Sequence, residues 1–351
     1  MKHKKILSAV LAVMMLCSGA AALQAAGHTP EGEAEVVTES LTNYRLGYMS
    51  WGVKKMGLDK LQKKLEASGK ELPEVRVAVI DTGLNTSNKY LQGRYTEDGY
   101  NFVKNNTNIF DDNNHGTMVS GIIADGTTSN VKILPIKANN QDGSGKMEDV
   151  KKAIYYAIEH DADVINMSLS AEDKNHSMTI LDDAIDAALA KGIVVVAAAG
   201  NQGGNVADRY PANKDSILTI GSINQLNHIA RSSNRGATVD FALPGALVTA
   251  PSGNAIEIAS GTSFSAPHAA AAAALLKTWD KSLTQDDIED ILKQYAVDMG
   301  KKGYDETYGW GMIDLSSFGL DGEPDASGTC LLRQLQEALK NRLQERFGVV
   351  G

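Results

Sequence analysis

Cysteine is almost absent from this sequence. Among 351 residues only Cys17 and Cys330 are cysteines. We expect Cys17 to be removed with an N-terminal signal, which leaves one thiol without an internal partner. The fold therefore cannot depend on internal disulfide bonds. The N-terminal apolar run, residues 6–16, is too short to cross a bilayer, so no transmembrane span is predicted.

Basic residues are also in short supply. The chain has 34 Lys and Arg against 43 Asp and Glu, a net charge of −9. Removal of residues 1–25, which carry three lysines and no acidic residue, would make the protein more acidic still. An acidic surface repels phosphate groups, which argues against nucleic acid and anionic membranes as partners.

The N-terminus has the pattern of a secretory signal peptide. Three lysines precede the apolar run of residues 6–16, and small residues follow it. We expect cleavage after Ala25, with neighbouring alanines as alternatives, and therefore a secreted protein. A lipid anchor on Cys17 is a minor alternative, because Leu16 stands where such an anchor prefers a small residue.

Short apolar runs alternate with helical patterns through the middle of the chain. This alternation predicts an α/β fold, a mostly parallel sheet covered by helices on both faces. We assign residues 26–45 to a polar leader, 46–320 to one domain, and 321–351 to a linker followed by an amphipathic helix. The strands are expected at residues 75–80, 131–136, 164–168, 193–198, 217–220 and 239–242, and helices at 58–67, 147–159, 180–190, 263–279 and 284–296.

Four polar residues stand at the ends of these predicted elements. Asp81 closes the first strand, and Asn201 follows the strand at 193–198. His115 lies where a polar loop meets an amphipathic segment, and Ser263 begins an alanine-rich helix. A helix-start serine has an exposed hydroxyl and a free amide. These residue types together suit acyl transfer: a nucleophile, a base, a carboxylate that orients the base, and an amide for the oxyanion.

Each residue alone has an ordinary alternative, as a helix cap, a turn residue or a surface histidine. The combination is what favours catalysis. The chain order Asp, His, Ser also differs from the orders found in α/β-hydrolases and in chymotrypsin-like enzymes.

The segments around these residues resemble the signature blocks of the subtilisin-like serine proteases, the subtilases. The blocks are Val-Ile-Asp-Thr-Gly at 79–83, His-Gly-Thr-Met-Val-Ser-Gly at 115–121, Ala-Ala-Ala-Gly-Asn at 197–201 and Gly-Thr-Ser-Phe-Ser-Ala-Pro-His at 261–268. The similarity extends over about residues 51–318. It implies a subtilisin-like fold and a serine endopeptidase that acts on polypeptides.

The resemblance also implies a role for each residue. Ser263 would be the nucleophile, His115 the general base and then acid, and Asp81 the residue that orients the imidazole. The Asn201 side chain and the Ser263 amide would form the oxyanion hole, and His268 would have a structural role. A catalytically silent relative that binds peptides is the alternative function, although none of the triad residues is missing.

Three segments match the family's substrate cleft. The edge that pairs with an extended peptide would be Gly143, Ser144 and Gly145. The walls of the primary specificity pocket would be Ser168, Leu169 and Ser170 on one side and Ala198, Ala199 and Gly200 on the other.

Arg209 departs from the family pattern, which commonly has a small residue at the far end of this pocket. A guanidinium there would favour an acidic substrate side chain before the scissile bond. The alternative is that Arg209 turns to solvent or pairs with Asp208.

Two further departures concern maturation and metals. About twenty residues separate the expected signal cleavage from the start of the similarity, too few for the folded propeptide of many subtilases. Residues 122–131 are also short where the family has a calcium-binding loop, so we predict no cofactor. Calcium at Asp111 and Asp112 is an alternative, but we expect these acids to be solvated loop residues. The C-terminal amphipathic helix, residues 330–347, would dock on the domain or mediate self-association.

Overall fold

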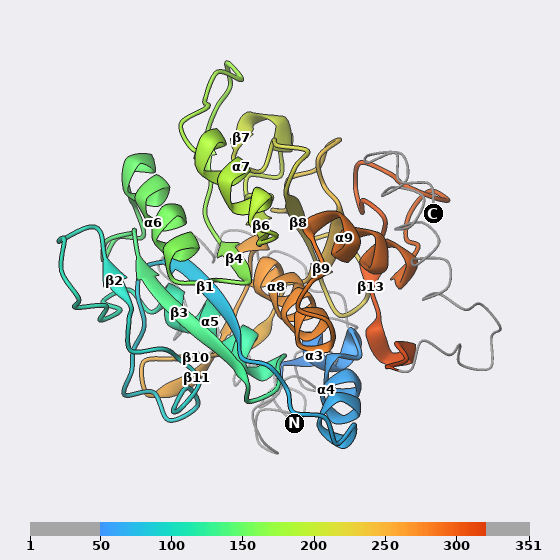
Figure 1. Ribbon diagram of the computed structural model, residues 1–351. Coiled ribbons are helices and arrows are strands. Elements are labelled where there is room, and N and C mark those ends of the chain that lie inside the picture. The colour runs from blue at the N-terminus through green and yellow to red at the C-terminus, as the bar shows by residue number, and fades with distance from the viewer. Residues whose placement is uncertain (1–49, 321–351) are drawn as a thin grey trace, which may run out of the picture.

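The computed structural model describes residues 50–320. Within this range a seven-stranded sheet has the order β2-β3-β1-β4-β6-β8-β9, and its neighbouring strands pair in parallel (Figure 1). The strands are β1 (Val75–Asp81), β2 (Tyr100–Asn101), β3 (Val131–Lys137), β4 (Val164–Met167), β6 (Val194–Ala198), β8 (Leu218–Ile223) and β9 (Phe241–Pro244). The apolar runs form these strands because both faces of the sheet are buried.

Side chains alternate between two cores along β1. Val75, Val77 and Val79 belong to the core on one face, and Ala78 and Ile80 to the core on the other. The first core is covered by α3 (Trp51–Lys55), α4 (Leu58–Ala67), α5 (His115–Asp125), α8 (Thr262–Trp279) and α9 (Gln285–Gln294). The second is covered by α6 (Met147–Glu159) and α7 (Asp182–Ala190). The prediction of helices on both faces is confirmed.

Helix α8 is buried along almost its whole length and contacts β4, β6, β8 and β9. Its run of alanines allows this close packing, because small side chains let a helix approach a sheet. None of the helices within residues 50–320 is long and apolar enough to span a membrane.

Short pairs complete the described chain: β10 (Val248–Ser252) with β11 (Ala255–Ala259), β5 (Ala171–Glu172) with β7 (Arg209–Tyr210), and β12 (Ala296–Val297) with β13 (Met312–Ile313). There are also two 3₁₀ turns: η2 (Val206–Asp208) directly precedes β7, and η3 (Leu315–Ser317) follows β13. The capping box of Thr284 and Asp287 begins α9.

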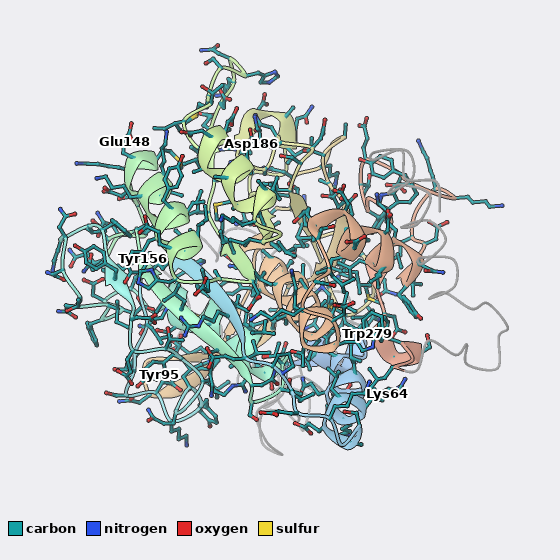
Figure 2. The ribbon with its side chains drawn as sticks, viewed as in Figure 1. Lys64, Tyr95, Glu148, Tyr156, Asp186 and Trp279 are labelled. Atoms are coloured by element: carbon teal, nitrogen blue, oxygen red, sulfur yellow. The ribbon has the colours of Figure 1, made fainter. Side chains whose placement is uncertain are left out.

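The last described residues pack beside α4. The Phe318 ring meets Trp279 with a centroid distance of 5.1 Å, and the Lys64 ammonium donates to the Phe318 carbonyl at 2.7 Å. Lys64 and Trp279 lie next to each other there (Figure 2). The predicted signal peptide, leader, C-terminal linker and terminal helix lie outside the described residues.

Candidate active site

The parallel sheet brings the ends of its strands to one edge. Strand β1 ends at Asp81, and Asn201 follows the end of β6. Helix α5 begins at His115, and α8 begins one residue before Ser263. Ligands and chemistry collect at the carboxyl edge of such sheets, because loops and helix N-termini converge there.

His115 and Asp81 form a direct hydrogen bond. The distance from His115 Nδ1 to Asp81 Oδ1 is 2.8 Å, and the Thr82 amide donates to the same oxygen at 2.7 Å. The Asp81 side chain is buried, while 28% of the His115 side chain is exposed. A carboxylate on Nδ1 favours the tautomer with the proton on that atom, which leaves Nε2 free to accept a proton.

The electrostatics of His115 favour the charged ring. Burial lowers the pKa of His115, but the charge and hydrogen bond of Asp81, with the charge of Asp111, outweigh it and raise the pKa above its usual value. The carboxylates therefore stabilise the imidazolium that forms when the ring takes up a proton.

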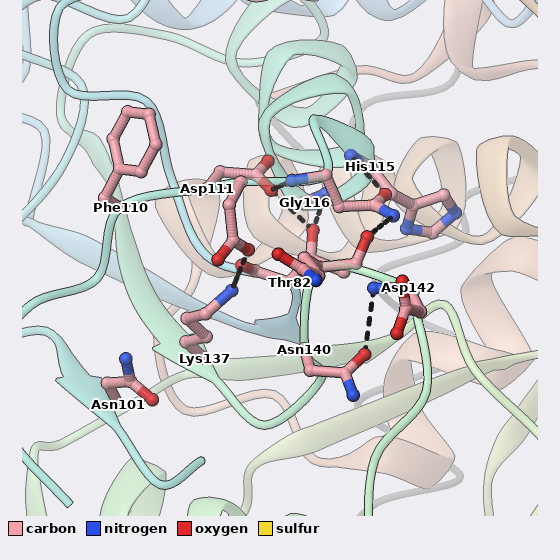
Figure 3. A network of polar contacts seen from close by, with 12 residues as sticks. Thr82, Asn101, Phe110, Asp111, His115, Gly116, Lys137, Asn140 and Asp142 are labelled. Carbon is pink, nitrogen blue, oxygen red and sulfur yellow. Dashed lines mark hydrogen bonds and ion pairs between the residues drawn. The ribbon is translucent and has the colours of Figure 1, made fainter. Parts of the chain in front are cut away.

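Asp111 organises the loop that presents His115 (Figure 3). One of its oxygens accepts the Thr82 hydroxyl at 2.8 Å, and the other accepts the Thr117 amide at 2.8 Å and the Thr117 hydroxyl at 2.6 Å. The Gly116 amide in turn donates to the Thr82 hydroxyl at 2.9 Å. Asp111 is thus a buried brace between β1 and α5, and the prediction that it is a solvated loop residue is wrong. In the sequence, the signal for this role is the position of Asp111 in the polar loop, four residues before His115.

Ser263 and Asn201 meet through the residues around the start of α8. The side-chain oxygen of Asn201, Oδ1, accepts a hydrogen bond from the Thr262 amide at 2.8 Å and from the Thr262 hydroxyl at 3.0 Å. Its oxygen is thereby occupied, so the amide nitrogen is the group available to a substrate. The Phe264 ring lies 5.3 Å from the His115 ring between centroids, so this turn of α8 packs against His115.

No hydrogen bond joins the Ser263 hydroxyl to His115 within the described residues. Catalytic hydrogen bonds are often long without substrate and shorten only in the complex. The His268 side chain is fully buried in α8 and donates from Nδ1 to the Phe264 carbonyl at 2.8 Å. Burial lowers its pKa to about 4, so this ring stays neutral.

The sequence profile of the subtilase family matches residues 73–311. The chain belongs to the subtilase family. It is 36% identical over 267 residues to subtilisin DY of Bacillus licheniformis, covering 72% of this chain and 94% of that protein. The solved structure of a cold adapted subtilisin-like serine proteinase matches with a TM-score of 0.61 at 29% identity, covering 69% of this chain and 87% of that one. The predicted family and fold are confirmed.

Two other relatives are longer than this subtilase. The chain is 34% identical to the minor extracellular protease Epr of Bacillus subtilis (strain 168), covering 70% of this chain and 39% of that protein. It is 37% identical to the thermophilic serine proteinase of Bacillus sp. (strain AK1), covering 66% of this chain and 59% of that protein. It therefore spans less than two thirds of the length of these two relatives.

The predicted cleft segments have different roles in the packing of this subtilase. Ser168 is almost fully buried, and its hydroxyl donates to the Ser263 carbonyl at 2.7 Å, so it braces the first turn of α8. Gly145 forms an antiparallel β-bridge with Asn139 at the other end of the same loop. A Cβ atom on Gly145 would overlap the Asn139 side chain. Gly143 has a φ of 77°, a conformation that glycine adopts without strain, and a Cβ there would meet only Asn113. Ser144 is exposed.

The two predicted pocket walls differ in exposure. Leu169 and Ser170 are half-buried, whereas Ala198, Ala199 and Gly200 are buried. Arg209 lies against the second wall, because a Cβ atom on Gly200 would stand 3.4 Å from Arg209 Cγ. Among the described residues the guanidinium makes no hydrogen bond or ion pair, and Asp208 pairs with His176 at 3.2 Å instead.

Metal binding finds no support in the described residues. Between residues 50 and 320 there is no cluster of three His, Cys, Asp or Glu side chains that could hold an ion. Asp111 and Asp112, the alternative calcium ligands, are each occupied by other partners, Asp112 by the Lys137 ammonium at 2.8 Å.

Proposed function

We propose that this chain is a secreted serine endopeptidase that cleaves polypeptides through Ser263, His115 and Asp81. The observation that carries the proposal is the 2.8 Å hydrogen bond from His115 Nδ1 to the buried Asp81 carboxylate. It leaves Nε2 as the basic atom on a partly exposed ring, next to the helix turn that carries Ser263. Membership of the subtilase family supports the same reaction.

In the first half of the reaction the Ser263 hydroxyl attacks the scissile carbonyl, and His115 Nε2 takes up its proton. Asp81 stabilises the resulting imidazolium. The imidazolium then gives the proton to the leaving amine, which departs and leaves an acyl-serine. In the second half water attacks the acyl group, His115 accepts the water's proton and returns it to Ser263. The Asn201 amide and the Ser263 backbone amide donate to the oxyanion in both halves.

The substrate would lie as an extended strand along residues 143–145. The pocket for the residue before the scissile bond would be lined by Ser168, Leu169 and Ser170, and by Ala198, Ala199 and Gly200. Arg209 would close this pocket and select an acidic side chain. The stem of Arg209 against Gly200 supports this assignment. Glu172, which stands opposite Arg209 across β5 and β7, is the carboxylate with which an acidic substrate side chain would compete for the guanidinium.

Secretion is supported by the signal-like N-terminus and by a relative whose name describes an extracellular protease. A lipid anchor on Cys17 and self-association through the C-terminal helix are finer alternatives. The proposed mechanism uses no cofactor.

A fluorophosphonate probe tests the proposal. Such a probe phosphonylates an activated serine and should label the wild-type protein at Ser263, with loss of labelling in Ser263→Ala. The variant should also lose peptidase activity by about a million-fold in kcat, a size taken over from subtilisin, a relative of this chain. An unlabelled wild-type protein would indicate a silent, peptide-binding relative.

A further inference from the structure

Lys137 is a buried cation beside the candidate base. It is the last residue of β3 and stands in register with Asp81, the last residue of β1. Its side chain is 2% exposed. The ammonium donates to Asp112 Oδ1 at 2.8 Å and to the Thr82 carbonyl oxygen (Figure 3). Burying an ammonium is costly unless it is paired and hydrogen-bonded, so its two partners account for its presence here.

Both partners of Lys137 are connected to the His115 side of the site. The Thr82 amide donates to the Asp81 oxygen that also holds His115, and its hydroxyl bridges Asp111 and the Gly116 amide. Asp112 lies three residues before His115, in the loop that leads into α5. A single ammonium therefore links the end of β1 to the loop that presents the base.

We propose that the Lys137–Asp112 ion pair is a positioning and charge-balancing device for His115. This inference rests on the proposed function, in which His115 is the general base. Lys137 touches no reacting atom. It acts through Thr82, by fixing the backbone next to Asp81, and through its positive charge, by offsetting part of the negative charge around the imidazole.

The charges near His115 come from several elements. Asp81 comes from β1, Asp111 and Asp112 from the loop before α5, and Lys137 from β3. Lys104, from the turn after β2, acts on Asp112, and α8 contributes the uncharged Phe264 ring. Burial alone would raise the pKa of Asp112, but the hydrogen bond and charge of Lys137 hold it below its usual value. Asp112 therefore faces the Lys137 ammonium as a carboxylate at neutral pH.

The two halves of the pair should shift the pKa of His115 in opposite directions. Lys137→Met removes a positive charge from the side of the site where Asp81 and Asp111 already favour the imidazolium, so the imidazolium gains stability and its pKa rises. Asp112→Asn removes a negative charge, so the pKa falls. Each shift should be about 0.3–1 pH unit, the range expected for one charge at moderate distance in a partly solvated site. The double variant restores the balance and should return close to wild type.

The experiment follows the His115 titration by NMR in the Ser263→Ala background, where the protein cannot digest itself. The ring signal is assigned by its loss in His115→Gln. In active protein the acid limb of kcat/KM against pH should move as the pKa does. Lys137→Met should also lower plateau kcat/KM by about 3–10-fold, mainly in kcat, because the base is held less firmly. Lys151→Met is the matched control, since Lys151 pairs with Asp183 at 2.8 Å away from these residues.

Opposite shifts for the two single variants, with Lys151→Met unchanged, support the inference. Unchanged titrations, or shifts in the same direction, overturn it. Should Lys137→Met fail to fold, Asp112→Asn decides alone, because the Asp112 side chain is 32% exposed and an asparagine oxygen there can still accept from the Lys137 ammonium. The proposed function fails separately, if the wild-type protein shows no Ser263-dependent cleavage, and the NMR titration remains decisive in that case.

Discussion

At the scale of single residues, neighbours decide what each polar side chain of the site can do. The Asn201 oxygen is held by Thr262 and its nitrogen is left to donate, whereas the Ser168 hydroxyl is used up on the Ser263 carbonyl. Asn201 and Ser168, from two different segments that resemble the family, therefore serve different purposes. One is available to a substrate, and the other stabilises the helix turn beside it.

Replacing Asn201 by Ala should slow turnover and leave substrate binding nearly unchanged, because the amide acts mainly on charge that develops in the transition state. The expected loss is about 10²–10³-fold in kcat, a size taken over from the oxyanion-hole donor of subtilisin, a relative of this chain. Steady-state kinetics on a peptide substrate measure it. A rise in KM at constant kcat would instead make Asn201 a substrate-positioning residue.

Arg209 should determine which residue precedes the cleaved bond. Peptides with Glu at that position should exceed matched Leu peptides by about 10–100-fold in kcat/KM, because a charged hydrogen bond in a pocket is worth about 1.5–3 kcal/mol. Arg209→Gly should reverse the order. The preference should weaken in high salt, as ionic interactions do. Better cleavage of Leu than Glu peptides by the wild type would mean that the guanidinium points away from the pocket.

At the scale of elements, loops from different strands are tied together around the site. The Asn113 side chain, in the loop before α5, donates to the Gln141 carbonyl at 2.7 Å. Gln141 lies in the loop that leads to the proposed substrate edge at residues 143–145. The loop that leads to His115 therefore also supports the proposed substrate edge at residues 143–145.

Asn113→Ala should loosen that edge and raise KM. Loss of the hydrogen bond to Gln141, about 1 kcal/mol, corresponds to about a fivefold change in KM. The variant also loses the bond that the Asn113 oxygen accepts from the His115 amide at 3.2 Å, which should lower kcat by a smaller factor. Asn130→Ala is a suitable control, because Asn130 donates to the Pro73 carbonyl at 2.7 Å outside this loop pair. Equal KM values for Asn113→Ala and wild type would show that the edge holds its shape without this bond.

At the scale of the whole molecule, two half-buried carboxyl groups make stability depend on pH. Burial raises the pKa of Asp125 to about 7 and that of Asp240 to about 8, although backbone amides of Ser50 and Thr219 donate to them. Both values lie above those of an unfolded chain. The stability these groups contribute is therefore complete below about pH 4 and is lost as the pH rises towards 7–8.

Asp240→Asn should remove part of this dependence. The quantity to compare is the free energy of unfolding of the variant minus that of wild type. This difference should be more favourable to the variant at pH 8.5 than at pH 5 by on the order of 1–3 kcal/mol, since an amide has no charge to bury. Urea unfolding in the Ser263→Ala background measures the difference. Asp186→Asn, at an exposed position on α7 (Figure 2), is the control and should show no such trend. Parallel pH profiles for Asp240→Asn and wild type would contradict the assignment.

Local pattern alone determined the alternation of buried strands and helices, and the positions of Asp81, His115, Asn201 and Ser263 at element ends. Apolar periodicity and helix-start signals depend only on residues that are neighbours in the sequence, so they can be recognised without the tertiary structure. Family motifs added the roles. Strand β9 still begins two residues after its predicted start, because its pairing with β8, which starts at Phe241, decides where the ladder begins.

Only the tertiary structure decided which partner each polar group has. Asp111 was predicted to be solvated and is buried under Thr82 and Thr117, and Lys137 at the end of a strand is a buried cation joined to Asp112. The contacts of Lys137 with Asp112 and with Thr82 join residues that are 25 and 55 positions apart. The energy of a buried charge depends on which groups the fold brings within hydrogen-bond distance, and no local pattern carries that information.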